Sequence, residues 1–164
     1  MTTKADFTEE EWARLGRAPL VAGMAISFAD PGGPIEAIKE SSAAIKTVLE
    51  AAEGGGHGEF VQALAADVAE QARQHHNPMA GFKPKGAQAR EQIVEELRAV
   101  NALLIEKTSP DETAQVRQWL KSAAQRAASA AKEGGFLGFH AQRVSEGEQR
   151  MLDTLGEIFD GPAA

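Results

Sequence analysis

The chain has 164 residues, a formal net charge of −7 and no cysteine. This length is typical of one domain with one hydrophobic core, so we expect a single domain over residues 1–164 with its core at about 7–160. The acidic excess lies in the first half, because residues 1–82 carry 6 basic and 12 acidic side chains, whereas residues 83–164 carry 11 and 12. A chain with this balance lacks the basic surface that nucleic-acid binding requires.

The absence of cysteine excludes disulfides, thiolate nucleophiles and cysteine-based zinc sites, and it is typical of a reducing compartment. The first residues form no apolar signal core, and the longest apolar stretch, residues 18–29, is shorter than the ~20 residues of a membrane span. We therefore expect a cytoplasmic protein that does not span a membrane.

Helices are the expected secondary structure throughout. Alanine is abundant, tyrosine is absent, and Val and Ile are too scattered to form alternating strand patterns. The composition therefore predicts an all-α fold, a single-domain bundle of six to seven helices.

The first predicted helix begins at Glu9, because Thr8 and Glu11 have the spacing of a capping box. Phe7 is placed to pack on Trp12 across this helix start.

A second helical segment is expected over residues 20–29, because Pro19 suits a first helical position, with a kink or a short turn before it. Apolar residues occur on nearly every side of this segment, which predicts a central hydrophobic helix near residues 19–29. They are Leu20, Val21, Met24, Ala25, Ile26 and Phe28.

A third helix is expected to begin at Pro34 and to end before the glycines at 54–56. Its apolar stripe, predicted to face the core, comprises Ile35, Ile38, Ile45, Val48, Leu49 and Ala52. A fourth helix, at about 58–75, carries Phe60, Val61, Leu64, Val68 and Ala72 on one side. The Pro- and Gly-rich residues 77–86 then form the main internal loop.

Three more helices are expected in the second half of the chain. One spans about 87–107, and the next follows a second capping box, Ser109 with Glu112, and carries a run of alanines from 123 to 131. The last follows a third box, Ser145 with Glu148, and ends before Gly161.

Four histidines are the first candidates for chemistry, and only His75 and His76 are adjacent. Adjacent helical residues point about 100° apart, so these two could share a metal ion only where the helix end unwinds. A polar C-terminal turn, where the helix dipole favours imidazolium, is the interpretation we favour over a metal site. The sequence lacks Glu-x-x-His, His-Glu-x-x-His, Walker A and Gly-x-Ser-x-Gly motifs, so it predicts no catalytic residue and no cofactor.

Three cations, Lys83, Lys85 and Arg90, lie just before and within the start of the helix expected at 87–107. Free N–H groups at a helix start can bind a phosphate or a carboxylate, whereas solvated loop charge is the ordinary alternative. The loop at 134–144 holds three large apolar residues, Phe136, Leu137 and Phe139. We expect them either to fold back over the bundle or to form a surface that binds a partner.

The stretch Val144-Ser-Glu-Gly-Glu-Gln-Arg-Met-Leu-Asp-Thr-Leu, together with residues 24–33, resembles the loop-to-helix pattern of TerB-like helical proteins of tellurite resistance and stress response. The chain is also similar to a small bacterial all-helical family. The resemblance implies a helical, stress-related protein. TerB-like proteins have an acidic loop that can hold a metal, but here the residues before Ser145 read His140-Ala-Gln-Arg-Val without an Asp-Gly.

Two hypotheses of function follow. The first is a non-enzymatic bundle that acts through protein contacts, chiefly self-association, with Phe136, Leu137 and Phe139 as its surface. The second is a bundle that binds a small anionic ligand or a metal through the region from residue 75 to residue 90, with His75, His76, Lys83, Lys85 and Arg90 as its polar groups. An enzyme is the third and least supported class.

Overall fold

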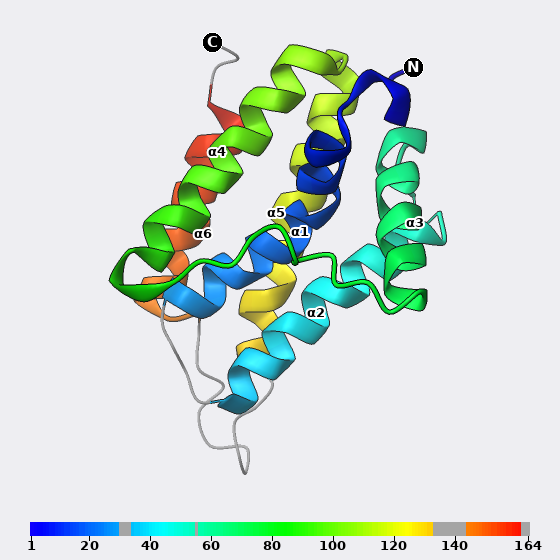
Figure 1. Ribbon diagram of the computed structural model, residues 1–164. Coiled ribbons are helices and arrows are strands. Elements are labelled where there is room, and N and C mark those ends of the chain that lie inside the picture. The colour runs from blue at the N-terminus through cyan, green and yellow to red at the C-terminus, as the bar shows by residue number, and fades with distance from the viewer. Residues whose placement is uncertain (30–33, 55, 133–143, 162–164) are drawn as a thin grey trace.

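The computed structural model describes residues 1–29, 34–54, 56–132 and 144–161. Six α-helices and two short 3-10 helices make up this part of the chain, and it contains no strand (Figure 1), which confirms the all-α prediction. The α-helices are α1 (Glu9–Ala29), α2 (Pro34–Ala52), α3 (Glu59–Arg73), α4 (Ala89–Lys107), α5 (Pro110–Lys132) and α6 (Glu146–Asp160). The 3-10 helices are η1 (Lys4–Asp6) and η2 (Gly86–Gln88).

Helix α1 is the centre of the bundle. It packs against each of the other five α-helices, and Figure 1 shows it crossing the middle of the molecule in front of α5. Val21, Ala22, Ala25 and Ile26 are completely buried, as the apolar residues on nearly all sides of this segment predicted. Leu20 and Met24 are only partly buried, and Phe28 remains 43% exposed.

The helix runs through Pro19 without a break. The sequence suggested two segments, either kinked or separated by a turn, and the structure shows one continuous helix from Glu9 to Ala29. Proline has no N–H for the carbonyl four residues earlier, which weakens the helix at this point. Burial offsets that loss, because Leu15, Ala18 and Val21 around the proline are completely buried.

All three predicted capping boxes are present. At the start of α1, the Glu11 N–H donates to Thr8 Oγ1 at 3.2 Å and the Thr8 N–H donates to Glu11 Oε2 at 2.7 Å. Equivalent reciprocal bonds join Ser109 with Glu112 and Ser145 with Glu148. Side chains therefore satisfy N–H groups at these helix starts that have no partner within the helix.

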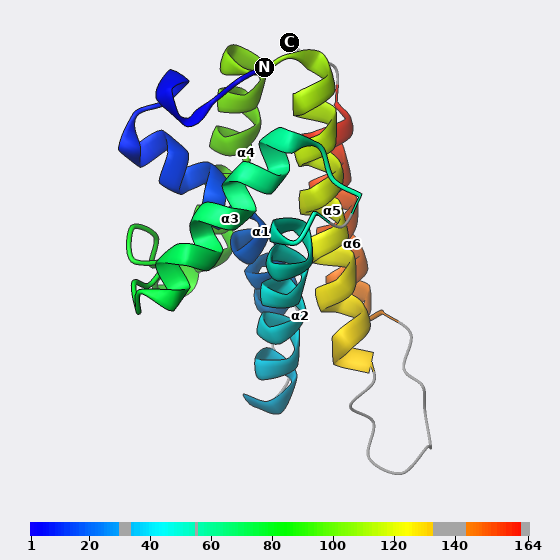
Figure 2. The ribbon, with the colours of Figure 1, turned by 90° about the vertical axis from the view of Figure 1, so that its right-hand side faces the viewer.

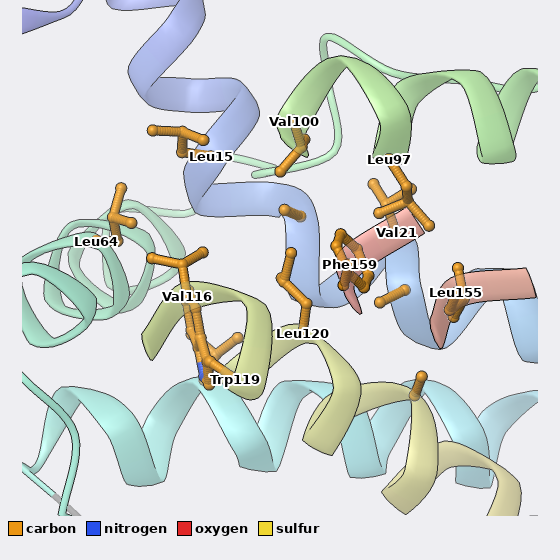
Figure 3. Close-up of a cluster of buried hydrophobic side chains, with 14 of the residues drawn as sticks. Leu15, Val21, Leu64, Leu97, Val100, Val116, Trp119, Leu120, Leu155 and Phe159 are labelled. Atoms are coloured by element: carbon orange, nitrogen blue, oxygen red, sulfur yellow. The ribbon is translucent and has the colours of Figure 1, made fainter. Parts of the chain in front are cut away.

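One continuous core joins side chains from all six α-helices. Figure 3 shows its centre, where Leu120 of α5 points toward α1, Trp119 of α5 points toward α2, and Phe159 of α6 reaches in between α1 and α4. The small residues of α5 let its neighbours approach closely, since Ala123, Ala124, Ala127 and Ala128 are completely buried.

Helices α1 and α3 also approach closely, at Gly16, where a Cβ atom would lie 2.9 Å from Val68 Cγ2. No helix in the described ranges is long and apolar enough to cross a membrane.

Candidate functional site: an apolar pocket between three helices

An open pocket of about 450 Å³ lies between the second half of α1, helix α2, the last turns of α3 and the start of the connection that follows α3. Helix α1 contributes Leu20, Met24, Ser27 and Phe28; α2 contributes Ser41, Ala44, Ile45, Val48 and Leu49; and α3 contributes Val68, Ala69 and Ala72. Asn77, Pro78 and Met79 complete the wall. No acidic, basic or histidine side chain is among these lining residues, so the pocket offers a ligand burial and a few neutral polar groups.

The floor of the pocket belongs to the core, whereas its rim is unusually apolar for a surface. Ala44, Val48 and Val68 are buried, and their packing is part of the bundle itself. Phe28, Ile45 and Leu49 remain 43%, 50% and 47% exposed. Apart from Met1, they are the most exposed large apolar residues among those whose side chains the structure describes, and all three line the same pocket.

The apolar stripe of α2 explains how the rim arises. We predicted that Ile45, Val48 and Leu49 face the core together, but only Val48 is buried there, at 3% exposure. Ile45 and Leu49 lie on the side of α2 that borders the pocket. The apolar stripe of α2 is thus wider than the surface that the neighbouring helices cover. The expectation that the whole stripe is buried in the core was wrong for Ile45 and Leu49.

The connection from α3 to α4 forms one wall through three residues at its start. The Met79 N–H donates to Asn77 Oδ1 at 2.9 Å, and the Phe82 N–H donates to the Met79 carbonyl at 3.0 Å, so this stretch is folded on itself. The side chains of Met79 and Phe82 pack against the edge of the core. Figure 1 shows the connection, in green, crossing over α1 on its way to α4.

A buried ion pair lies under this crossing. Arg17 of α1 is 5% exposed, and its Nη2 donates to Glu96 Oε1 of α4 at 2.8 Å. Arg14 Nε donates to the same oxygen at 3.2 Å. A Cβ atom on Gly81 would lie 3.0 Å from Arg17 Nη1, so the glycine allows the connection to lie directly on the arginine.

His75 and His76 end helix α3 rather than line the pocket. His75 adopts a left-handed conformation with φ of 61°, its N–H donates to the Ala72 carbonyl at 3.1 Å, and the His76 N–H donates to the Gln71 carbonyl at 2.8 Å. This is the Schellman pattern, in which the residue with the left-handed conformation is usually glycine. Both side chains are exposed, and the described residues contain no group of three or more His, Asp or Glu side chains that could hold a metal ion.

The cations of the candidate site lie farther along the same connection. Lys83 and Lys85 are exposed, and Arg90 is exposed in the first turn of α4 after the short helix η2. None of the three lines the pocket or forms an ion pair with a described residue. The other candidate surface, Phe136, Leu137 and Phe139, lies outside the described residues.

Sequence reasoning identified the connection and its basic residues but not the pocket beside them. The available signal was an excess of large apolar residues on two helices, Met24 with Phe28 on α1 and Ile45 with Leu49 on α2. The pattern shows that these residues are apolar, but not whether a neighbour covers them.

Comparison with known proteins adds no family to this picture. The chain matches no protein-family model, no curated protein and no solved structure. The pocket itself is therefore the feature that points to a function.

Proposed function

We propose that this protein binds a small, mainly apolar ligand in the pocket between α1, α2 and α3. The observation that carries the proposal is the pocket of about 450 Å³ with three half-exposed large apolar side chains at its rim. Its size falls within the range of small-molecule sites, roughly 300–1,000 Å³. It differs from the second hypothesis from the sequence, in which polar groups between residues 75 and 90 bind a small anion or a metal.

Burial of apolar surface supplies the affinity in this proposal. Each methylene group that leaves water contributes about 0.8 kcal/mol, so an alkyl chain that buries about eight of them gains about 6 kcal/mol. That gain corresponds to a dissociation constant of tens of micromolar. Met24 of α1 and Met79 of the connection both line the pocket, and unbranched methionine side chains adapt readily to such a ligand.

The methionines also provide a direct test. The chain has four: Met1, Met24, Met79 and Met151. Only Met24 and Met79 line this pocket, while Met151 is 1% exposed in the core and Met1 is 86% exposed. With ¹³C-methyl methionine, titration with dodecanol should shift the Met24 and Met79 signals in a saturable way and leave those of Met1 and Met151 unchanged.

A filled pocket provides the matched control. Ala72 of α3 is exposed and lines the pocket, so Ala72→Trp places an indole in the space intended for the ligand. Ala66 is exposed on the same helix but does not line the pocket, so Ala66→Trp makes the same change elsewhere. We expect Ala72→Trp to abolish the dodecanol shifts and Ala66→Trp to keep them. Equal shifts of all four methionines, or no saturable shift, would refute the proposal.

Self-association remains the other candidate, because Phe28, Ile45 and Leu49 form an apolar surface that a second copy could cover. Sedimentation of the protein with and without dodecanol distinguishes the two. Self-association would be favoured over a ligand site by a dimer that dissociates when dodecanol binds and that does not form in the Leu49→Ser variant.

A further inference from the structure

We infer that the ligand is a single alkyl chain that ends in an anionic group, with the chain in the apolar pocket and the anion held by the basic connection that forms one of its walls. This inference rests on the proposed function and adds the charge of the ligand to it. Three observations carry it: the distribution of charge along the chain, the ion pairs of the described cations, and the position of the connection.

Positive charge is concentrated in one segment of an acidic protein. Residues 71–90 contain four basic residues, Arg73, Lys83, Lys85 and Arg90, and no Asp or Glu, so their formal charge is +4 in a chain whose total is −7. The two histidines in this segment, His75 and His76, are both exposed.

Three of the four cations of this segment, Lys83, Lys85 and Arg90, also lack acidic partners among the described residues. Among the basic residues whose side chains the structure describes, ten form ion pairs with a carboxylate: Lys4, Arg14, Arg17, Lys46, Arg73, Arg98, Lys107, Lys121, Arg126 and Arg150. Arg117 instead donates to Asn101 Oδ1 at 2.8 Å. Lys83, Lys85 and Arg90 form no such pair within the described ranges, so their charge is available to an anion from outside the chain.

The uncompensated charge lies close to the pocket in the fold. Asn77, Pro78 and Met79 line the pocket, and Lys83 follows Met79 by four residues, which places their Cα atoms at most about 14 Å apart. The chain between them is held on α1, because Phe82 packs on the core and Gly81 lies against Arg17. An extended alkyl chain of about ten carbons has a comparable length, so a ligand seated in the pocket can place its end group beside the lysine ammonium groups.

The charges on the other borders of the pocket favour this end for the anion. On α3, Glu70 accepts hydrogen bonds from Arg73 and Gln74, so its charge and that of Arg73 compensate each other. On α2, Glu50 is paired with Lys46 and Arg126. These charges are paired with one another, whereas Lys83 and Lys85 of the connection and Arg90 of α4 pair with no described carboxylate.

The test compares ligands that share one chain and differ in the end group. Dodecanoate, dodecanol and dodecyltrimethylammonium, each below its micelle-forming concentration, are titrated into the protein and followed through the Met24 and Met79 methyl signals and by calorimetry. We expect dodecanoate to bind about threefold or more tighter than dodecyltrimethylammonium at low ionic strength, and the difference to shrink at 0.5 M salt, because exposed charges are screened. Dodecyl phosphate in place of dodecanoate then distinguishes a phosphate from a carboxylate end group.

The variant that tests the connection is Lys83→Gln with Lys85→Gln. It should remove the preference for dodecanoate and leave dodecanol binding unchanged. Arg98→Gln with Arg150→Gln changes the net charge of the protein by the same amount on exposed faces of α4 and α6, and it should keep the preference. A preference for dodecanoate that is equal in the two double variants would overturn the inference, as would equal affinity of the wild type for the anionic and cationic ligands. In either case normal dodecanol binding would leave the proposed function standing, whereas no binding of any of the ligands would refute both.

Discussion

Leu49 and Leu64 offer a comparison that separates residues of the pocket from residues of the core. Leu49 of α2 is 47% exposed at the pocket rim, and Leu64 of α3 is completely buried. Leu64→Ala removes a fully packed side chain and should lower the free energy of unfolding by about 2–5 kcal/mol. Leu49→Ala removes about half as much buried surface, in a place where no closed cavity can form, and should cost about 1 kcal/mol.

Urea titration followed by tryptophan fluorescence measures both effects. Trp12 and Trp119 are 4% and 0% exposed, so both indoles enter water when the chain unfolds. The effects of the two variants on ligand binding should have the opposite order, because the exposed part of Leu49 is covered only when a ligand fills the pocket. Leu49→Ala should then weaken dodecanol binding by about fivefold, whereas Leu64→Ala, measured where it is fully folded, should not change it. Equal losses of stability in the two variants would refute the assignment of Leu49 to the pocket.

Three further predictions concern the residues that hold the framework of the site. Glu96→Gln leaves the buried Arg17 without its carboxylate and should lower stability by about 3–5 kcal/mol, and a loss below about 1 kcal/mol in urea titration would show that the pair is unimportant. His75→Gly should raise stability by about 0.5–1 kcal/mol because glycine adopts the left-handed conformation without steric cost, and a lower melting temperature would contradict the cap. Burial raises the pKa of Glu112, but hydrogen bonds from Thr2 and Ser109 outweigh it and lower the pKa to about 2 from an ordinary 4.5. A lowered pKa stabilises the fold above pH 4.5, and this stability is lost as the pH falls toward 2. Glu112→Gln should therefore flatten the pH dependence of the free energy of unfolding in that window. An unchanged profile would argue against the hydrogen bonds to Glu112.

Local physics accounts for the elements that the sequence predicted correctly. Capping boxes at Thr8, Ser109 and Ser145 depend on residues three positions apart, and the glycines and prolines around residues 54–56 and 77–86 act on their own backbone. Such signals need no knowledge of neighbouring helices, and the helix starts at Glu9 and Pro110 agree with the structure. At Pro19 the sequence left a kink or a short turn open, and the structure contradicts only the turn, because α1 continues through the buried proline.

The candidate site was only partly predictable for the same reason. The sequence indicated that residues 77–86 form a loop that carries Lys83 and Lys85, and that His75 and His76 end a helix. The sequence could not show that Asn77, Pro78 and Met79 line a pocket, because that depends on where the connection crosses α1. Figure 2 shows α3 on one side of α2 and α5 on the other. Helix α5 is far from α2 in the sequence, so local patterns do not predict this arrangement.

The sequence by itself determined that the chain is helical, where its three capped helices begin and that the residues near 19–29 are central, because periodicity and capping are properties of neighbouring residues. The tertiary structure decided which apolar side chains are covered. Val48 and Ile45 belong to one apolar stripe three residues apart, yet Val48 is 3% exposed and Ile45 is 50% exposed. The difference arises because burial is a property of the neighbours that fold against a helix face, and on this face of α2 they leave a pocket open.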